Sequence, residues 1–484
     1  MNREIKRVST VVLAMFLALL VSTSILQVFQ ADTLAADARN SRALNDSYAQ
    51  QRGAILVAGQ PVAQSVAAND VYKFQRVYSN GPLYSSVTGF FPINGEATGL
   101  EGALNDKLSG SSNSQFFDRV NAILTGKNPQ GASVETTILP AAQQAAYDAL
   151  GNLQGAVVLL EPKTGRILAM VSKPSYDPNA LASHDTAKVN ALYQQLLSAS
   201  GDPLINRTIG GNLNPPGSTF KPVMSAAAFG TGQYTKDSQL PNLASLQLPG
   251  SGTVVKNDTF TTCGPGDTVS IATAQILSCN IPFAELGMKL DPQVIKSQAD
   301  KFGFNQKLSI PIPVEPSVYP LYTDAAERGQ GSFGQFDDRA TPLQMAMVSA
   351  GIANGGKVMY PNLVDSIRSP DLQTLESFQP QVLDQAATQE NADIVKQMMV
   401  DGVDHGVASN ARIDGVKVGG KTGTAQNGAN DPYTLWFTGF APADNPQFAV
   451  AVVVENGGGQ GQNGTGNSIA APIAKKVLEA VLNK

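Results

Sequence analysis

The feature that most limits how this chain can fold is an uncharged, apolar run near its start, from Val8 to Ala31. A helix needs about 20 apolar residues to cross the hydrocarbon layer of a membrane, and this run is long enough. Arg3, Lys6 and Arg7 precede it. The positive-inside rule therefore predicts that the N-terminus stays in the cytoplasm and that the rest of the chain lies outside.

A cleaved signal peptide is the alternative interpretation of the same run. The small residues from Leu34 to Ala38 could pass for a cleavage site. The run is long for a signal peptide, which favours an uncleaved anchor. We expect residues 1–32 to form a cytoplasmic tail and a single-pass helix in the cell membrane, followed by an extracytoplasmic protein.

The rest of the chain predicts two domains. With 484 residues in all, the protein is too long for one ordinary domain. Residues 33–139 read as a small, strand-rich domain in which we find no catalytic constellation, so we expect docking or dimerisation there. Residues 140–484 form the second, larger domain. A formal net charge of -5 gives no basic field for phosphates, so nucleic-acid binding is not expected.

The second domain has strand patterns at both ends and helical patterns between them. Residues 155–171 predict a hairpin of two apolar strands, and residues 432–440 and 448–454 predict two more. The intervening helices and a last amphipathic helix are expected at 219–229, 271–290, 341–354 and 469–482. This order predicts an α/β (α+β) fold, an antiparallel sheet built from both ends of the domain and flanked by helices.

A candidate nucleophile, Ser218, follows the turn Pro215-Pro216-Gly217 as a helix opens, and Lys221 stands three residues later. That spacing brings both side chains to one face of a helix. A serine needs a base to take its proton, and a lysine can do so only when neutral. Burial, a second cation or the positive end of the helix would lower the lysine pKa. The simpler alternative is a capping serine followed by a solvated lysine.

Two further motifs support the catalytic interpretation. Enzymes that react with penicillin combine SxxK with S-x-N and KTG elements. This chain has Ser278-Cys279-Asn280 after an apolar helix, and Lys421-Thr422-Gly423-Thr424 after a glycine pair. Two chance matches, 111–113 and 163–165, precede Ser218 and lie in a polar linker and in a hairpin turn. The order serine, S-x-N, KTG therefore selects the downstream pair.

With these motifs the chain resembles the class B penicillin-binding proteins. Residues 155–171 and 436–442 look like parts of that family's transpeptidase domain, which is of the penicillin-binding or serine beta-lactamase type. The likeness runs from about residue 140 to the C-terminus. The small N-terminal domain resembles the short form found in the penicillin-binding protein A branch of actinobacteria.

The resemblance implies a peptidoglycan D,D-transpeptidase without a cofactor or metal. Ser218 would attack the penultimate D-alanyl carbonyl of a stem peptide, Lys221 would be the base, Ser278 would relay a proton, and Asn280 would hold Lys221 and the substrate amide. The KTG element would bind the substrate: Lys421 supplies positive potential, Thr422 and Thr424 bind the terminal carboxylate, and Gly423 completes the strand. The backbone N–H groups of Ser218 and Thr424 would form the oxyanion hole. Beta-lactams would acylate Ser218 as mimics of D-Ala-D-Ala.

The resemblance also implies partners. A class B protein depends on a separate glycan polymerase, so we expect a membrane polymerase of the SEDS type, together with proteins of the divisome or of cell elongation. A D,D-carboxypeptidase, a beta-lactamase and a beta-lactam sensor share the same motifs and stay open as alternatives. A scaffold whose serine site is vestigial belongs to a different class of function. The motifs leave the acceptor amine open.

The only two cysteines are Cys263 and Cys279, and the predicted topology places both on the oxidising side of the membrane. A disulfide between them would contribute about 3 kcal/mol on the chain-entropy model, provided that the geometry permits it. With His184 and His405, the two cysteines show no ligand spacing for a metal. We read His405 as a surface or cap residue, and the sole tryptophan, Trp436, as packing behind the KTG strand.

Overall fold

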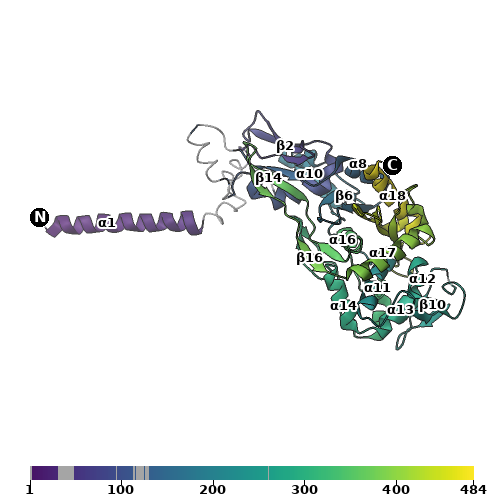
Figure 1. Ribbon diagram of the computed structural model, residues 1–484. Coiled ribbons are helices and arrows are strands. Elements are labelled where there is room, and N and C mark those ends of the chain that lie inside the picture. Colours follow the sequence, from purple (N-terminus) through teal and green to yellow (C-terminus); the bar gives the residue numbers. More distant parts are fainter. Residues whose placement is uncertain are drawn as a thin grey trace.

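The computed structural model describes residues 3–30, 48, 50–93, 95–112, 115, 125, 130–259 and 261–483. The first element is α1 (Arg3–Ser24), continued by one π-helical turn, η1 (Ile25–Phe29). It buries none of its residues, and it lies apart from the rest of the chain (Figure 1). The span Arg3–Val28 is the one described helix that is long and apolar enough to cross a membrane.

A five-stranded antiparallel sheet forms the centre of the C-terminal part, in the order β17-β18-β19-β5-β6. Its strands come from both ends of this region, as predicted, because β19 pairs directly with β5. The strands are β5 (Gly155–Leu160), β6 (Ile167–Lys173), β17 (Gly419–Ala425), β18 (Thr434–Ala441) and β19 (Phe448–Val454). Since β17 is an edge strand, its outer side is available to a ligand.

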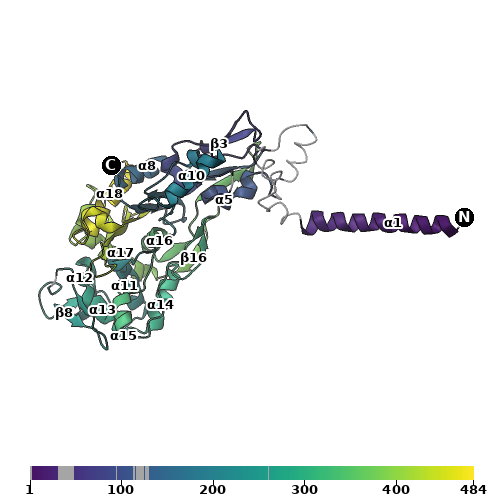
Figure 2. The same cartoon turned by 180° about the vertical axis from the view of Figure 1, so that it is seen from behind.

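Both faces of this sheet are covered, which explains why the central strands β5 and β19 are apolar throughout. Val157 and Leu159 belong to the cluster under α8 (Pro140–Leu150) and α18 (Ala471–Leu482). Val158 and Leu160 alternate with them and face the buried helix α16 (Pro342–Ala353). Figure 2 shows α8 and α18 together beside the C-terminus, with α16 deeper in the molecule.

A helical lobe follows β6 in the chain and lies below the sheet in Figure 1. The buried helix α11 is packed against α13, α14 and α17. The helices α9 (Pro178–Leu181) and α10 (Thr186–Leu197) also follow β6 in the chain, but they lie beside the N-terminal part (Figure 1). The helices of the lobe are α11 (Lys221–Gly230), α12 (Ile271–Ile276), α13 (Asn280–Lys289), α14 (Pro292–Lys301), α15 (Ala325–Gly331) and α17 (Gln389–Asp404). Short strand pairs join them: β7 (Gln239–Pro241) with β10 (Thr268–Ser270), β8 (Ser245–Gln247) with β9 (Val254–Lys256), β11 (Leu308–Ser309) with β12 (Pro313–Val314), and β13 (Lys357–Met359) with β16 (Val382–Gln385).

The single helix expected over residues 271–290 is two helices in the structure. It breaks at Ser278, whose backbone has the left-handed φ of 60°. A non-glycine residue rarely adopts this conformation, so the break marks a position at which surrounding contacts fix the chain.

The N-terminal domain is built on a six-stranded sheet that the sequence did not predict in full. Its order is β15-β14-β4-β1-β2-β3, and the first two of these strands come from the middle of the predicted second domain. The strands are β1 (Ile55–Val57), β2 (Gln60–Ala67), β3 (Phe74–Tyr78), β4 (Ser133–Thr136), β14 (Val364–Arg368) and β15 (Thr374–Ser377). The boundary between 33–139 and 140–484 stays a prediction for the chain, while the sheet itself draws on both sides of it.

A buried ionic cluster holds this N-terminal domain together beside the short helices α4 (Gly81–Thr88), α5 (Gly99–Ala103) and α6 (Asn105–Leu108). The fully buried Glu101 accepts hydrogen bonds from Arg52 Nε and Arg76 Nε, each at 2.6 Å. Arg52 also donates to Asn105 Oδ1 at 2.7 Å, and its guanidinium lies over the Phe91 ring. One buried carboxylate is thus paired with two buried cations, which offsets its cost of desolvation.

Candidate active site

Ser218 lies in a tight turn that is held from two sides. It belongs to a 3-10 turn, η3 (Gly217–Phe220), and Lys221 then begins α11. Gly217 has a φ of +55° and donates its N–H to Gly334 O at 2.8 Å. A Cβ atom on Gly334 would lie 2.1 Å from Gly217 O, so only glycine allows this approach. The α-helix therefore begins at Lys221, slightly later than the predicted start at residue 219, and Ser218 lies in the turn before it.

Lys221 is fully buried, and its Nζ is surrounded by three oxygen atoms. Nζ lies 2.9 Å from Ser218 Oγ, 2.7 Å from Ser278 O and 2.8 Å from Asn280 Oδ1. The last two oxygens can only accept hydrogen bonds. A neutral amine has two N–H groups to satisfy them, which leaves its lone pair facing the Ser218 hydroxyl. This is the arrangement that a general base for Ser218 requires.

The electrostatics favour the neutral form of this lysine. Burial, and next the positive charge of Lys421, hold the pKa of Lys221 well below its usual range, while Asp258 acts in the opposite direction. Burial also lowers the pKa of Lys421 to about 7. The charge of Lys421 thus disfavours protonation of Lys221, as happens when like charges are close.

The S-x-N element connects the two lysines. Ser278 Oγ accepts a hydrogen bond from Lys421 Nζ at 2.6 Å, while its carbonyl accepts from Lys221. Asn280 begins α13, and its amide nitrogen donates to Lys256 O at 3.0 Å and to Asp258 Oδ1 at 3.1 Å. These donor contacts fix the amide so that its oxygen faces Lys221.

A disulfide joins Cys263 to Cys279, with 5.9 Å between their Cα atoms. It ties the segment that follows β9 to the residue between Ser278 and Asn280. In the same segment, Asn257 Oδ1 accepts from Asn280 N at 2.9 Å and from the next amide at 3.1 Å. The S-x-N turn is thus held by a covalent bond and a side-chain cap.

The KTG residues lie on the edge strand β17, close to the serine turn. Within them, Gly423 allows the contact, because a Cβ atom there would lie 2.9 Å from Pro216 O. Lys421 is almost fully buried. Behind the strand, the fully buried Trp436 pairs with Gly423 across the ladder and donates Nε1–H to Pro215 O at 2.9 Å. The packing role predicted for Trp436 is confirmed.

A cavity of about 400 Å³ opens in front of these groups. Ser218, Ser278, Thr422 and Thr424 line it together with residues 257–259 and 261–264, the Cys263–Cys279 disulfide and the apolar side chains of Leu277 and Val407. The structure therefore brings the three motifs to one place. The earlier KTG match, 163–165, lies in the hairpin turn between β5 and β6, as expected, and residue 113 of the other match lies outside the described residues.

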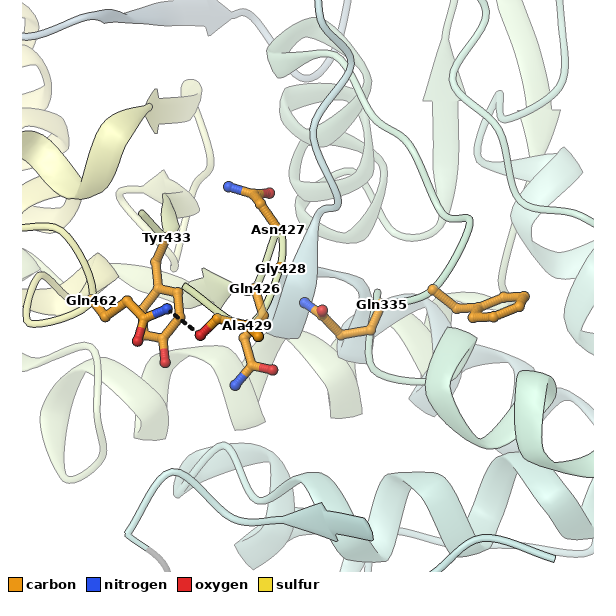
Figure 3. A pocket seen from close by; sticks show the side chains of 8 residues that line it. Gln335, Gln426, Asn427, Gly428, Ala429, Tyr433 and Gln462 are labelled. Carbon is orange, nitrogen blue, oxygen red and sulfur yellow. Dashed lines mark hydrogen bonds between the residues drawn. The ribbon is translucent and has the colours of Figure 1, made fainter. Parts of the chain in front are cut away.

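A second cavity, of about 380 Å³, lies where the chain continues beyond β17. Figure 3 shows Gln335 reaching from one wall toward the loop that holds Gln426 and Ala429, and Gln462 donating to Ala429 O across 3.0 Å. Its lining is uncharged and consists of Gln335, Phe336, Gln426, Asn427, Gly428, Ala429, Tyr433 and Gln462.

Two residues of the site carry no signal in the sequence. Asp258 and Asn257 belong to no motif, and only the fold places them against Asn280.

The predicted role of His405 is confirmed, since it is exposed and forms the C-cap of α17. Within the described ranges, no group of three or more His, Cys, Asp or Glu residues is placed to hold a metal ion.

Two family models match this chain. The penicillin binding protein transpeptidase domain matches residues 155–479, and the penicillin binding protein A dimerisation domain matches residues 52–134. Among curated proteins, the peptidoglycan D,D-transpeptidase PbpA of Mycolicibacterium smegmatis is 41% identical over 493 residues, which cover 100% of both chains. The PbpA of Mycobacterium tuberculosis is 40% identical over 491 residues, with 100% of this chain and 99% of the relative covered.

Solved structures agree with these matches. The ceftriaxone acyl-enzyme complex of penicillin-binding protein A from M. tuberculosis has a TM-score of 0.87 at 40% identity, and the likeness covers 90% of this chain and 100% of that one. The penicillin G acyl-enzyme complex of the same protein has a TM-score of 0.85 at 40% identity, with the same coverage.

Proposed function

Because this chain belongs to the class B penicillin-binding proteins, we propose that it is a peptidoglycan D,D-transpeptidase that cross-links stem peptides through an acyl-enzyme on Ser218. The observation that carries this proposal is the contact of Lys221 with Ser218 at 2.9 Å. Two pure acceptors take the N–H groups of the lysine, and burial lowers its pKa. Both observations favour the neutral amine, which can remove the serine proton.

Acylation follows from the positions of these groups. Ser218 Oγ attacks the carbonyl of the penultimate D-alanine and gives its proton to Lys221. The N–H groups of Ser218 and Thr424 stabilise the oxyanion that forms, since both residues border the same cavity. Lys221 and Ser278 then return a proton to the nitrogen of the leaving D-alanine. An amine from a second stem peptide replaces the ester with an amide cross-link.

The KTG strand recognises the substrate in this proposal. Thr422 and Thr424 line the cavity and bind the terminal carboxylate of the stem, and Gly423 lets the strand approach the serine turn. Lys421 bears the charge that favours this carboxylate. Burial lowers the pKa of Lys421 to about 7, and a bound carboxylate would raise it and favour the ammonium form.

Covalent labelling with a fluorescent penicillin tests the nucleophile. We expect a stable adduct on the wild type, none on Ser218→Ala, and labelling slowed by about 10²–10⁴-fold in Lys221→Met, the range that a general base supplies. Rapid release of hydrolysed penicillin would instead indicate a beta-lactamase, and an unlabelled wild type would favour a scaffold. Incubation with lipid-linked precursor and a glycan polymerase then distinguishes cross-linked muropeptides from the trimmed stems of a carboxypeptidase.

The membrane anchor and the partners are part of the same proposal. The helix α1 is unburied, and three basic residues in its first turns precede its apolar stretch, which supports an N-terminus in the cytoplasm and a catalytic domain outside. Protease protection in membrane vesicles tests this orientation. The class B resemblance supports a separate SEDS-type polymerase, with division or elongation proteins, as partner. Co-purification from detergent, compared with a variant that lacks α1, tests that association.

A further inference from the structure

The catalytic cavity contains one carboxylate that the mechanism above does not use. Asp258 lines the cavity together with Ser218 and Ser278, and the other described lining residues are uncharged. Its Oδ1 accepts a hydrogen bond from Asn280 Nδ2 at 3.1 Å. Within the described residues, Oδ2 has no hydrogen-bond partner, and the residue is exposed to the cavity. One carboxylate oxygen is therefore available to a ligand.

The charge of Asp258 acts on the centre of the site. Its field raises the pKa of both Lys221 and Lys421, in opposition to the burial that lowers them. A cation that enters the cavity is repelled by these two buried amines when they are protonated, and it is attracted by the carboxylate of Asp258, which lines the cavity.

The acceptor of a transpeptidation is such a cation. A primary alkyl amine is an ammonium at neutral pH, because its pKa lies near 10. It also has to reach the acyl carbon from the side from which the amine of D-alanine has departed, because the second half of the reaction reverses the first with another amine. That side is the cavity in front of Ser218. The other cavity, beyond β17, offers an ammonium no charged group (Figure 3).

We propose that Asp258 binds the ammonium group of the acceptor stem peptide and positions it over the acyl-enzyme. This inference rests on the proposed function and adds the site of its second substrate. The bound ammonium loses one proton to solvent, and its nitrogen then forms a bond to the acyl carbon. The ester bond to Ser218 Oγ breaks, and Lys221 passes the second proton from the nitrogen to that oxygen. An amide and a free serine result.

The test measures how the acyl-enzyme partitions between water and amines. Full-length protein in detergent is given an N-acyl-D-alanyl thioester as donor. One acceptor is N-acetyl-lysine amide, which is a cation at neutral pH, and the other is hydroxylamine, which is neutral. Asp258→Asn removes the charge, Asp258→Glu keeps it, and Asp267→Asn makes the same charge change in the same segment, outside the cavity lining.

We expect Asp258→Asn to lower the ratio of aminolysis to hydrolysis about fivefold for the cationic acceptor, the effect of losing one exposed ion pair. The ratio of hydroxylamine transfer to hydrolysis should stay unchanged, because both reactions consume the same acyl-enzyme and neither involves a cationic acceptor. Asp258→Glu should restore most of the lost ratio, and Asp267→Asn should behave as the wild type does.

Three results would overturn the inference. An unchanged ratio for the cationic acceptor would show that Asp258 does not bind it. Equal losses with both acceptors would show that Asp258 acts only by holding Asn280 or through its effect on the pKa of the two lysines. A wild type that no thioester or penicillin acylates would refute the proposed function and this inference with it, an outcome distinct from the other two.

Discussion

Because Asn280 contacts Lys221, a substitution at Asn280 that adds one negative charge tests the role of the lysine. Asn280 Oδ1 lies 2.8 Å from Lys221 Nζ, so Asn280→Asp places a carboxylate beside the amine with little change in size. Two opposite charges about 4 Å apart attract by about 4 kcal/mol at an effective dielectric constant of about 20. At about 1.4 kcal/mol per unit, this energy raises the pKa of Lys221 by about three units. Repulsion from Asp258 reduces the rise to about two units.

Only the neutral amine can take the proton of Ser218, so a higher pKa for Lys221 slows acylation at neutral pH. We expect slower acylation at about pH 7, by at most about 100-fold, because only the part of the rise that takes the pKa above the pH lowers the neutral fraction, and recovery as the pH rises. The measurement is the second-order rate constant for a fluorescent penicillin over a series of pH values.

Asn280→Ala is the matched control for this experiment. It removes the hydrogen bond to Lys221 without adding a charge. The rate of acylation should therefore fall, but the acidic limb of the pH profile should not shift to higher pH. An Asn280→Asp protein that is slowed equally at every pH, or whose acidic limb stays where the wild type has it, would refute the assignment of Lys221 as the base.

Three further predictions concern stability and the order of the site, each measured by denaturant unfolding. Glu101→Gln leaves two buried guanidinium groups without their counter-ion and should lower the free energy of unfolding by about 3–5 kcal/mol; a loss below about 1 kcal/mol would contradict the ionic role of the cluster. Replacing Cys263 and Cys279 together by serine should cost about 3 kcal/mol for a loop with a separation of 16 residues, and should slow acylation by penicillin; unchanged acylation would show that the disulfide does not order the S-x-N turn. Burial holds the pKa of Asp338 well above its usual range, so the free energy of unfolding should fall as the pH rises from the normal carboxyl range toward that raised pKa. Asp338→Asn should remove this contribution, and an equal dependence of the free energy of unfolding on pH in the wild type and in Asp338→Asn would contradict the assignment.

The sequence allowed the centre of the site to be predicted because its chemistry requires residue types at fixed spacing. Ser218 and Lys221 are three residues apart on one turn, and the order of the motifs excluded the chance matches. The sheet was predictable too, since long apolar strands such as β5 and β19 leave little choice of partner. These features depend on local spacing and on burial, which a sequence records directly.

Other features depend on contacts between distant segments, and no local pattern reports them. In the sequence Asp258 is an ordinary polar residue of a loop, and only its contact with Asn280 in the folded chain identifies it as part of the site. The break at Ser278 comes from contacts with Lys221 and Lys421, 57 and 143 residues away in the chain, which override a helical pattern. Strands β14 and β15 are short and partly exposed, so the pairing of β14 with β4, and of β15 with β14, could not be predicted from residues 364–377 alone.

The pairing of β14 with β4 has a mechanical consequence. Strands before residue 139 and strands after residue 363 share one hydrogen-bonded sheet, so the two parts of the chain have no hinge between them along this edge. A force applied to the N-terminal part would act on β14 in shear, and the backbone hydrogen bonds between β4 and β14 would transmit this force to the catalytic half. A soluble fragment that began at residue 140 would expose a bare strand edge, and expression should therefore start before Arg52.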